Sequence, residues 1–209
     1  MKEAVRVPVL MYHRVADPKN AWEARYGIAP AGFRRHMEAL SRAGYRGVHI
    51  DALVDWLEGG PALPDGAIVI TFDDGFRSVR EQAQPVLAEL GWPFTIFLVS
   101  GLIGGEDDWT RDSNPAGVTY PLLDAQEIRE MQAQGVSFHS HTREHLSLPT
   151  LDDAALHEQL SGSRQELGQL LGHEAAYLAY PFGHVDPRVE GAARAAGYRA
   201  AFSTRSGFN

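Results

Sequence analysis

Two short segments of the chain carry side chains that can bind a metal ion and activate water. Asp73 and Asp74 directly follow an apolar run, residues 67–72. His141 and His145 are four residues apart, a spacing that would place two imidazoles on one face of a helical turn. One carboxylate and two imidazoles, with positions left for water, are the ligand set of a catalytic zinc-type site. The alternative is a solvated segment with two incidental histidines.

The two neighbouring carboxylates are expected to do different work. Side chains of adjacent residues that leave a strand point to opposite sides, so one carboxylate can ligate a metal while the other stays free as a base. Gly75 would let the backbone turn sharply into the next helix. Alternatively, Asp73 or Asp74 caps a helix that begins near Phe76. A double charge after so apolar a strand needs a partner, which favours the metal site.

A third histidine lies close to the first pair. His139 precedes His141 by two residues, and alternation along a strand would put both side chains on the same side. His139 is therefore a candidate third imidazole near the metal, although a supporting position or a place in the pocket wall is the better prediction. The other histidines that we weighed lack such context and are expected on the surface: His36, His49, His157, His173 and His184.

Composition narrows the classes of function. The 209 residues include no cysteine, so thiolate sites and disulfides are excluded, and any metal must be held by His, Asp or Glu. The chain contains neither the Gly-x-Ser-x-Gly sequence of serine hydrolases nor a phosphate-binding Gly-rich loop. A net charge of −8 argues against nucleic acid as a partner. A neutral or cationic substrate suits this chain better.

The sequence also bears on location. No run approaches eighteen apolar residues, so no membrane span is expected. The first residues lack the apolar core of a signal peptide, which predicts a cytoplasmic protein. An exported or cell-envelope protein whose leader had been removed would have the same sequence. No protein partner can be inferred.

A repeated order of helix, glycine and short β-rich run predicts the elements that position these residues. It recurs at Gly44, Gly91, Gly135 and Gly197. Repeated αβ units indicate a mainly parallel sheet. The expected strands are residues 6–12, 47–50, 67–72, 94–99, 136–140, 176–180 and 199–203. We expect an α/β fold, a small distorted or incomplete (β/α) barrel with about seven parallel strands, in a single domain over residues 1–209. A flavodoxin-like open sheet is the alternative.

Further signals mark helix boundaries and one loop. Asp124 with Glu127 and Thr150 with Asp153 have the spacing of capping boxes. Asp186 before Pro187 is typical of an N-cap followed by proline at the first helical position. A helix over residues 79–90 is expected to bend at Pro85. The stretch 100–123 is long for a structureless connection, which indicates a functional loop.

In parallel α/β folds the active groups gather at the C-terminal ends of the strands. Four of the expected strands end in polar or rigid residues: His13 and Arg14, then Asp73 and Asp74, then the segment 141–145, and finally Pro181-Phe182-Gly183. We therefore expect these side chains to open onto one mouth.

With these residues identified, the chain resembles the polysaccharide deacetylase family, the fourth carbohydrate esterase family. Residues 71–75, Thr-Phe-Asp-Asp-Gly, are similar to its first motif, and residues 140–145, Ser-His-Thr-Arg-Glu-His, to its second. The resemblance implies that Asp73 is the catalytic base and that Asp74, His141 and His145 bind the metal. It extends from Val7 to about Thr204.

Two departures point to one branch of this family. The third motif, residues 179–183, reads Ala-Tyr-Pro-Phe-Gly and lacks the usual Arg, and the late Leu-x-His motif has no match after Gly183. Both departures resemble the poly-β-1,6-N-acetylglucosamine deacetylases, in which an early Tyr-His-Arg segment enters the pocket. By that resemblance His13 would supply the general acid. Arg14 and His139 would support the site, and the segment Tyr180, Pro181 and Phe182 would bind substrate and the oxyanion.

The resemblance implies a hydrolase that uses one divalent metal, zinc first and cobalt, nickel or iron as alternatives. Its substrate would be a carbohydrate that contains N-acetylglucosamine, and acetate would be released. Two other functions stay open: the same site acting on another amide or on an O-acetyl ester such as acetylxylan, and a catalytically silent carbohydrate-binding relative.

Overall fold

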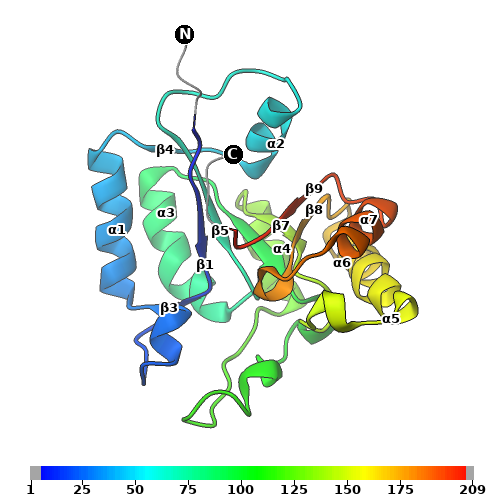
Figure 1. Cartoon of the computed structure of the whole chain (residues 1–209). Helices are drawn as coiled ribbons and strands as arrows, with labels where there is room; N and C mark the ends of the chain where they lie inside the picture. The colour runs from blue at the N-terminus through cyan, green and yellow to red at the C-terminus, as the bar shows by residue number, and fades with distance from the viewer. Residues whose placement is uncertain (1–5, 206–209) are drawn as a thin grey trace.

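A computed structural model describes residues 6–205 of the chain (Figure 1). Its main sheet has seven strands, all paired in parallel. Six of them lie in the order β1 (Val9–Tyr12), β5 (Ala67–Phe72), β6 (Thr95–Leu98), β7 (Ser137–Ser140), β8 (Tyr177–Ala179) and β9 (Ala200–Phe202). The seventh, β4 (Arg46–Gly47), pairs with the first residues of β5.

The main sheet curls into an incomplete barrel. After β5 the strands follow one another in chain order, and the edge strands β1 and β9 are not paired with each other. A doubly wound open sheet would instead reverse its strand order at a switch point. The predicted incomplete (β/α) barrel is thus confirmed, and the flavodoxin-like alternative is wrong.

Helices cover the outside of this sheet. They are α1 (Pro30–Arg42), α2 (Ile50–Leu57), α3 (Gln84–Leu90), α4 (Ala125–Ala133), α5 (Asp153–His157), α6 (Ser163–Leu171) and α7 (Pro187–Ala195). Single π-helical turns, Val79–Ala83 and Glu158–Gly162, precede α3 and α6. Short 3₁₀ turns are Glu23–Arg25, Ser100–Leu102, Asp108–Thr110, Leu148–Thr150 and Pro181–Gly183.

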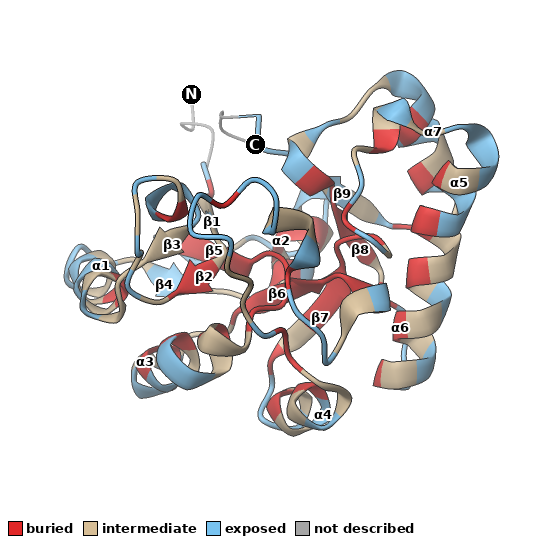
Figure 2. Ribbon diagram, turned by 90° about the horizontal axis from the view of Figure 1, so that it is seen from below, coloured by how far each residue is buried: buried red, intermediate tan, exposed pale blue. Residues whose placement is uncertain are grey.

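The core lies on both faces of the sheet. Every residue of β5 is buried, and Figure 2 shows the buried strands at the centre with helices whose outer faces are exposed. Phe33 and Met37 of α1 pack onto the outer face together with Phe72. On the inner face, Ile50 and Leu53 of α2 form a cluster with barrel residues that include Tyr177. Helix α2 therefore plugs the barrel at the end opposite the site described below.

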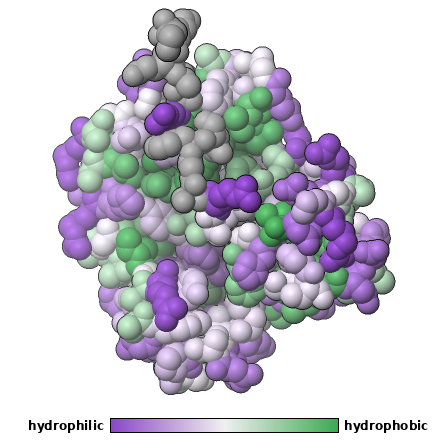
Figure 3. All heavy atoms as spheres, in the orientation of Figure 1, coloured by the Kyte–Doolittle hydropathy of each residue, from purple (hydrophilic) through white to green (hydrophobic). Residues whose placement is uncertain are grey.

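The outer surface carries both hydrophilic and apolar residues. Hydrophilic residues predominate around the outer helices in the space-filling view, and apolar residues appear there only in separate groups (Figure 3). Within residues 6–205, no helix combines the length and the apolar character that crossing a bilayer would demand.

Several predicted boundaries need correction. The run 47–50 was expected to be a strand, but only Arg46 and Gly47 pair with β5, and Ile50 begins α2 because its side chain is drawn into the barrel core. The second capping box is wrong, since Asp152 rather than Thr150 accepts a backbone hydrogen bond at the start of α5. A small pair of parallel strands, β2 (Arg14–Val15) and β3 (Gly27–Ile28), was not anticipated.

Other local predictions are confirmed. Asp124 and Glu127 form a reciprocal capping box at the start of α4. Asp186 caps α7 by accepting the N–H of Val189 at 2.8 Å. The helix expected over residues 79–90 is present as the π-helical turn Val79–Ala83 followed by α3, with Pro85 in the first turn of α3, where its missing N–H is tolerated; the bend at Pro85 stays a prediction.

Candidate metal centre and active site

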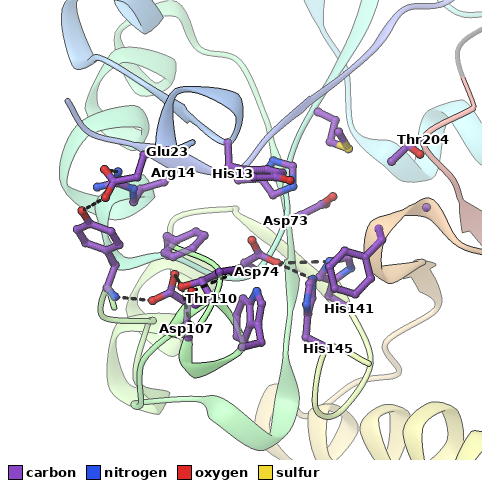
Figure 4. A pocket seen from close by; sticks show the side chains of 18 of the residues that line it. His13, Arg14, Glu23, Asp73, Asp74, Asp107, Thr110, His141, His145 and Thr204 are labelled. Carbon is purple, nitrogen blue, oxygen red and sulfur yellow. Dashed lines mark hydrogen bonds and ion pairs between the residues drawn. The ribbon is translucent and has the colours of Figure 1, made fainter. Parts of the chain in front are cut away.

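A cavity of about 520 Å³ opens at the C-terminal ends of the strands (Figure 4). All four strand ends singled out in the sequence contribute to it, as predicted. The predicted site residues that line it are His13, Arg14, Asp73, Asp74, His141, His145, Tyr180 and Phe182. These residues are far apart in the sequence. They meet at one cavity because parallel strands all end on the same side of the sheet.

Asp74, His141 and His145 form a compact cluster suited to a metal ion. The Nε2 atoms of His141 and His145 lie 3.4 Å and 3.3 Å from Oδ1 of Asp74. One ligand atom from each residue falls within 4.8 Å of the others, and all three residues are buried. Oδ1 of Asp74 has no hydrogen-bond partner among the described residues. A buried carboxylate oxygen without a donor is costly, and a cation between these three groups would remove that cost.

Both imidazoles are prepared to act as neutral ligands. Nδ1 of His141 donates to the carbonyl oxygen of Ala179 at 2.8 Å, which leaves the Nε2 lone pair facing Asp74. Burial lowers the pKa of His141 to about 3. The pKa of His145 is also lowered, by burial first and then by the neighbouring charges of His141 and His13. Neutral imidazole is the form that binds metals.

Aromatic rings hold His145 from two sides. The ring of Trp109 stacks on His145 with centroids 4.5 Å apart, and Phe182 meets it edge-on at 4.6 Å. Trp109 belongs to the stretch 100–123, which was predicted to be functional and which also brings Asp107 and Tyr120 to the cavity. Asp107 is buried and accepts hydrogen bonds from the Tyr120 N–H and the Thr110 hydroxyl.

The site has an unusual backbone. Four non-glycine residues have positive φ in the described part of the chain, and all of them lie at this mouth: Asp74 (72°), Thr142 (68°), His145 (57°) and Phe182 (60°). The helical turn expected for His141 and His145 is therefore wrong, and both residues lie in a loop. Such left-handed residues are costly and persist where the surrounding structure holds them, often at functional sites. The left-handed turn at Asp74 also interrupts strand alternation, so both carboxylates line the same cavity.

Asp73 and His13 occupy the same cavity without belonging to the metal-binding cluster. Burial raises the pKa of Asp73 to about 7 and lowers that of His13 to about 4. The pKa of Asp74 is raised well above its usual value, by burial first and then by the charges of Asp73 and Asp107. Three carboxyl groups thus crowd one side of a buried cavity, an arrangement that a bound cation would stabilise.

The remaining predicted residues take different places. Tyr180 is buried, which raises its pKa to about 12, whereas Phe182 is 52% exposed. Pro181 is buried within the turn and does not line the cavity. His139 does not line it either. It lies inside the barrel with its ring 4.4 Å from that of Tyr177, and its Nε2 is 3.0 Å from the Ser137 hydroxyl. The geometry therefore does not bring His139 to the metal-binding residues.

Arg14 is largely buried and lines the cavity without belonging to the metal-binding cluster. Its guanidinium pairs with Glu23 at 2.7 Å and lies 3.7 Å from the centre of the Tyr120 ring. Sequence reasoning missed Glu23 because nothing in its local sequence distinguishes it from a surface glutamate. Its partners Asn114 and Tyr120 are more than ninety positions away. His184, expected on the surface, is exposed but lies on the rim of the cavity.

Comparison with known families agrees with this site. The model of the polysaccharide deacetylase family matches residues 60–201. A second and shorter match, to a structural repeat of polyglycine hydrolase-like proteins, covers residues 19–54. The match to the polysaccharide deacetylase model includes Asp74, His141 and His145. His13 lies outside the matched residues.

Among curated proteins, the chain is 24% identical over 206 residues to the candidate polysaccharide deacetylase YxkH of Bacillus subtilis. This match covers 99% of the chain and 67% of YxkH. The chain is 25% identical over 150 residues to the poly-β-1,6-N-acetyl-D-glucosamine N-deacetylase of Staphylococcus aureus, covering 68% of the chain and 49% of that enzyme. The match thus spans about half the length of the staphylococcal enzyme.

Among solved structures, IcaB from Ammonifex degensii has the same fold, with a TM-score of 0.80 at 28% identity. The match covers 96% of this chain and 84% of that one. The resemblance to the poly-β-1,6-N-acetylglucosamine deacetylase branch is confirmed by the staphylococcal relative. The family model matches more than half of the residues of this chain, and the chain therefore belongs to the polysaccharide deacetylase family.

Proposed function

We propose that this chain is a metal-dependent hydrolase that removes N-acetyl groups from a saccharide containing N-acetylglucosamine and releases acetate. The observation that carries the proposal is the buried, unpartnered Oδ1 of Asp74 between two neutral imidazoles, with the carboxyl group of Asp73 in the same cavity. The staphylococcal relative, named for deacetylation of poly-β-1,6-N-acetyl-D-glucosamine, supports this class of substrate.

Asp74, His141 and His145 would hold one divalent ion, and zinc suits their oxygen and nitrogen donors best. When bound, such an ion would polarise the acetamide carbonyl and lower the pKa of water. Cobalt, nickel and iron are alternatives, since raw affinity does not separate these metals. Trp109 and Phe182 would keep the His145 ring in place, and the hydrogen bond to the Ala179 carbonyl would keep that of His141.

Asp73 is proposed as the base that accepts the proton of the attacking water. Burial raises its pKa to about 7, which matches a base that must both accept and release protons near neutral pH. It lines the same cavity as the metal-binding cluster but is not part of it, so its carboxylate remains free for proton transfer.

His13 is proposed as the group that protonates the departing amine. Burial lowers its pKa to about 4, so the imidazole is neutral at rest, and it would receive the proton that Asp73 takes from the attacking water and deliver it to the departing amine. Ionised Asp73 in the same cavity favours the charged imidazole by opposite charge. The backbone N–H of Phe182 is proposed as a donor to the oxyanion, on a turn that its left-handed conformation shapes.

Substitution of Asp73 tests the proposal. Asp73→Asn should lower kcat for acetate release from N-acetylglucosamine oligomers at least ~100-fold while the metal content of the purified protein stays unchanged. Asp74→Asn should lose the metal itself. Near-normal turnover of metal-loaded Asp73→Asn would contradict the assignment. Parallel assays on acetylated xylan, with and without chelator, would show whether the site instead prefers an O-acetyl ester.

A further inference from the structure

Two aromatic side chains lie on the rim of the cavity, apart from the metal-binding and proton-transferring groups. Trp22 and Tyr26 both line the cavity, and their ring centroids are 5.2 Å apart. Tyr26 is 46% exposed, which is unusual for so large a ring. Its ring also meets that of His13 edge-on at 5.8 Å. Ring contacts therefore lead from His13 through Tyr26 to Trp22. Trp22 and Tyr26 together are called the aromatic ledge below.

The backbone of the aromatic ledge is fixed by hydrogen bonds. The N–H of Trp22 donates to Oδ1 of Asn20 at 2.9 Å, and the N–H of Tyr26 donates to the carbonyl of Glu23 at 3.0 Å. The carbonyl of Tyr26 accepts from the N–H of Arg14 at 3.1 Å, directly beside His13. The position of Tyr26 is thus coupled to that of the proposed proton donor.

A buried carboxylate anchors the same segment to the stretch 100–123. Glu23 is 2% exposed and accepts from Arg14 at 2.7 Å and from the Lys19 N–H at 2.8 Å. It also accepts from Asn114 at 3.1 Å and from the Tyr120 hydroxyl at 2.7 Å, both in the stretch 100–123. Four donors on one carboxylate hold the aromatic ledge in place before any ligand arrives.

Aromatic rings with solvent-accessible surface, such as the exposed Tyr26 and the half-buried Trp22, suit a sugar ring. An aromatic face carries negative partial charge, and the C–H bonds on the face of a pyranose carry positive partial charge, so the two surfaces attract while apolar area is buried. Because the aromatic ledge is already ordered, little conformational entropy is lost on binding. Its continuity with the cavity that holds Asp73 and His13 favours a saccharide over an unrelated ligand.

We infer that Trp22 and Tyr26 form a second sugar-binding subsite, which takes a pyranose ring next to the one that is deacetylated. The inference rests on the proposed function and adds to it the two residues that would bind the neighbouring sugar, so that a single N-acetylglucosamine fills only part of the site.

Kinetics with substrates of different length test the subsite. Trp22→Ala and Tyr26→Ala should each lower kcat/KM for a β-1,6-linked N-acetylglucosamine tetramer about tenfold relative to the monosaccharide, mainly through KM. Trp22→Phe, which keeps an aromatic face, should recover much of the loss. Tyr45→Ala is the matched control, since Tyr45 precedes β4 at the other end of the barrel and does not line the cavity.

Binding measured without turnover separates the two proposals. Calorimetric titration of metal-loaded Asp73→Asn with the tetramer should give an affinity that falls about tenfold when Trp22→Ala is added. Equal tetramer affinities with and without Trp22→Ala, or an unchanged ratio of tetramer to monosaccharide kcat/KM in both ledge variants, would overturn the subsite alone. Wild-type protein that neither binds nor deacetylates any N-acetylglucosamine substrate would overturn the proposed function and the subsite with it.

Discussion

His145 depends on packing for its orientation, whereas His141 depends on a hydrogen bond. Nδ1 of His141 donates to the Ala179 carbonyl, but Nδ1 of His145 has no hydrogen-bond partner among the described residues. The ring of His145 instead lies between Trp109 and Phe182. Partners behind a metal ligand commonly set its affinity for the ion. We therefore expect the affinity for the metal to depend on ring packing at His145 and on the hydrogen bond to Ala179 at His141.

Removal of the indole from position 109 should weaken metal binding. Trp109→Ala leaves one face of the His145 ring uncovered, so the ring can rotate away from Asp74, and we expect the metal Kd to rise about tenfold. Trp109→Phe should retain most of the affinity, because a six-membered ring still covers the imidazole. Competition with a chromogenic chelator measures the Kd of each variant. An unchanged Kd in Trp109→Ala would show that Phe182 and the loop backbone suffice.

At the scale of elements, the 3₁₀ turn Glu23–Arg25 and the stretch 100–123 are joined by one buried ionic network. Burial by itself raises the pKa of Glu23. The hydrogen bonds from Lys19, Tyr120 and Asn114 and the charge of Arg14 outweigh burial and bring the pKa to about 2. Its usual value is 4.5. Because the pKa is lower in the folded state, Glu23 stabilises the fold above pH 4.5, and this contribution is lost as the pH falls towards 2.

Glu23→Gln should expose this contribution. At pH 7 the variant leaves Arg14 buried without its partner charge, and we expect a loss of about 3 kcal/mol in the free energy of unfolding. The gap between wild type and variant should shrink steadily as the pH is lowered from about 4.5 towards 2. Urea unfolding at a series of pH values measures it. A gap that stays constant over this range would mean that Glu23 titrates normally in the folded protein.

At the scale of the whole molecule, the incomplete barrel gathers negative charge at its mouth. Asp73, Asp74 and Asp107 are all buried there, and each has a pKa raised chiefly by burial. Like charges in a buried space destabilise the fold unless a cation or protons compensate them. The fold should therefore be more stable with a divalent ion than without one.

Thermal unfolding checks this coupling. Zinc at a thousandfold excess over its Kd adds about 4 kcal/mol to the stability of the native state, which should raise the Tm by on the order of 10 °C. Asp74→Asn should abolish the shift. At pH 8 the metal-free variant should be no less stable than metal-free wild type, since it carries one buried carboxylate fewer. A zinc-induced shift of the same size in Asp74→Asn would place the ion elsewhere.

Local patterns in the sequence determined much of the fold of this protein. Periodic apolar residues and glycine junctions specify seven parallel strands and the helices between them, because burial and turn geometry act over a few residues. Strand ends on one side of a parallel sheet then bring His13, Asp73, Asp74, His141 and His145 to one mouth. The ligand chemistry of these residue types and the family resemblance could thus be read from the sequence.

Tertiary structure alone decided the rest. The left-handed residues Asp74, Thr142 and His145 have no signal in sequence, because their cost is met by contacts that only the folded chain supplies. The spacing of His141 and His145 suggested a helical turn, whereas packing imposed a loop. The pairing of Glu23 with Tyr120 spans 97 positions, and no local pattern encodes a contact at that separation. His139 has the right spacing for the site, yet depth along the strand places it inside the barrel, two residues from the mouth.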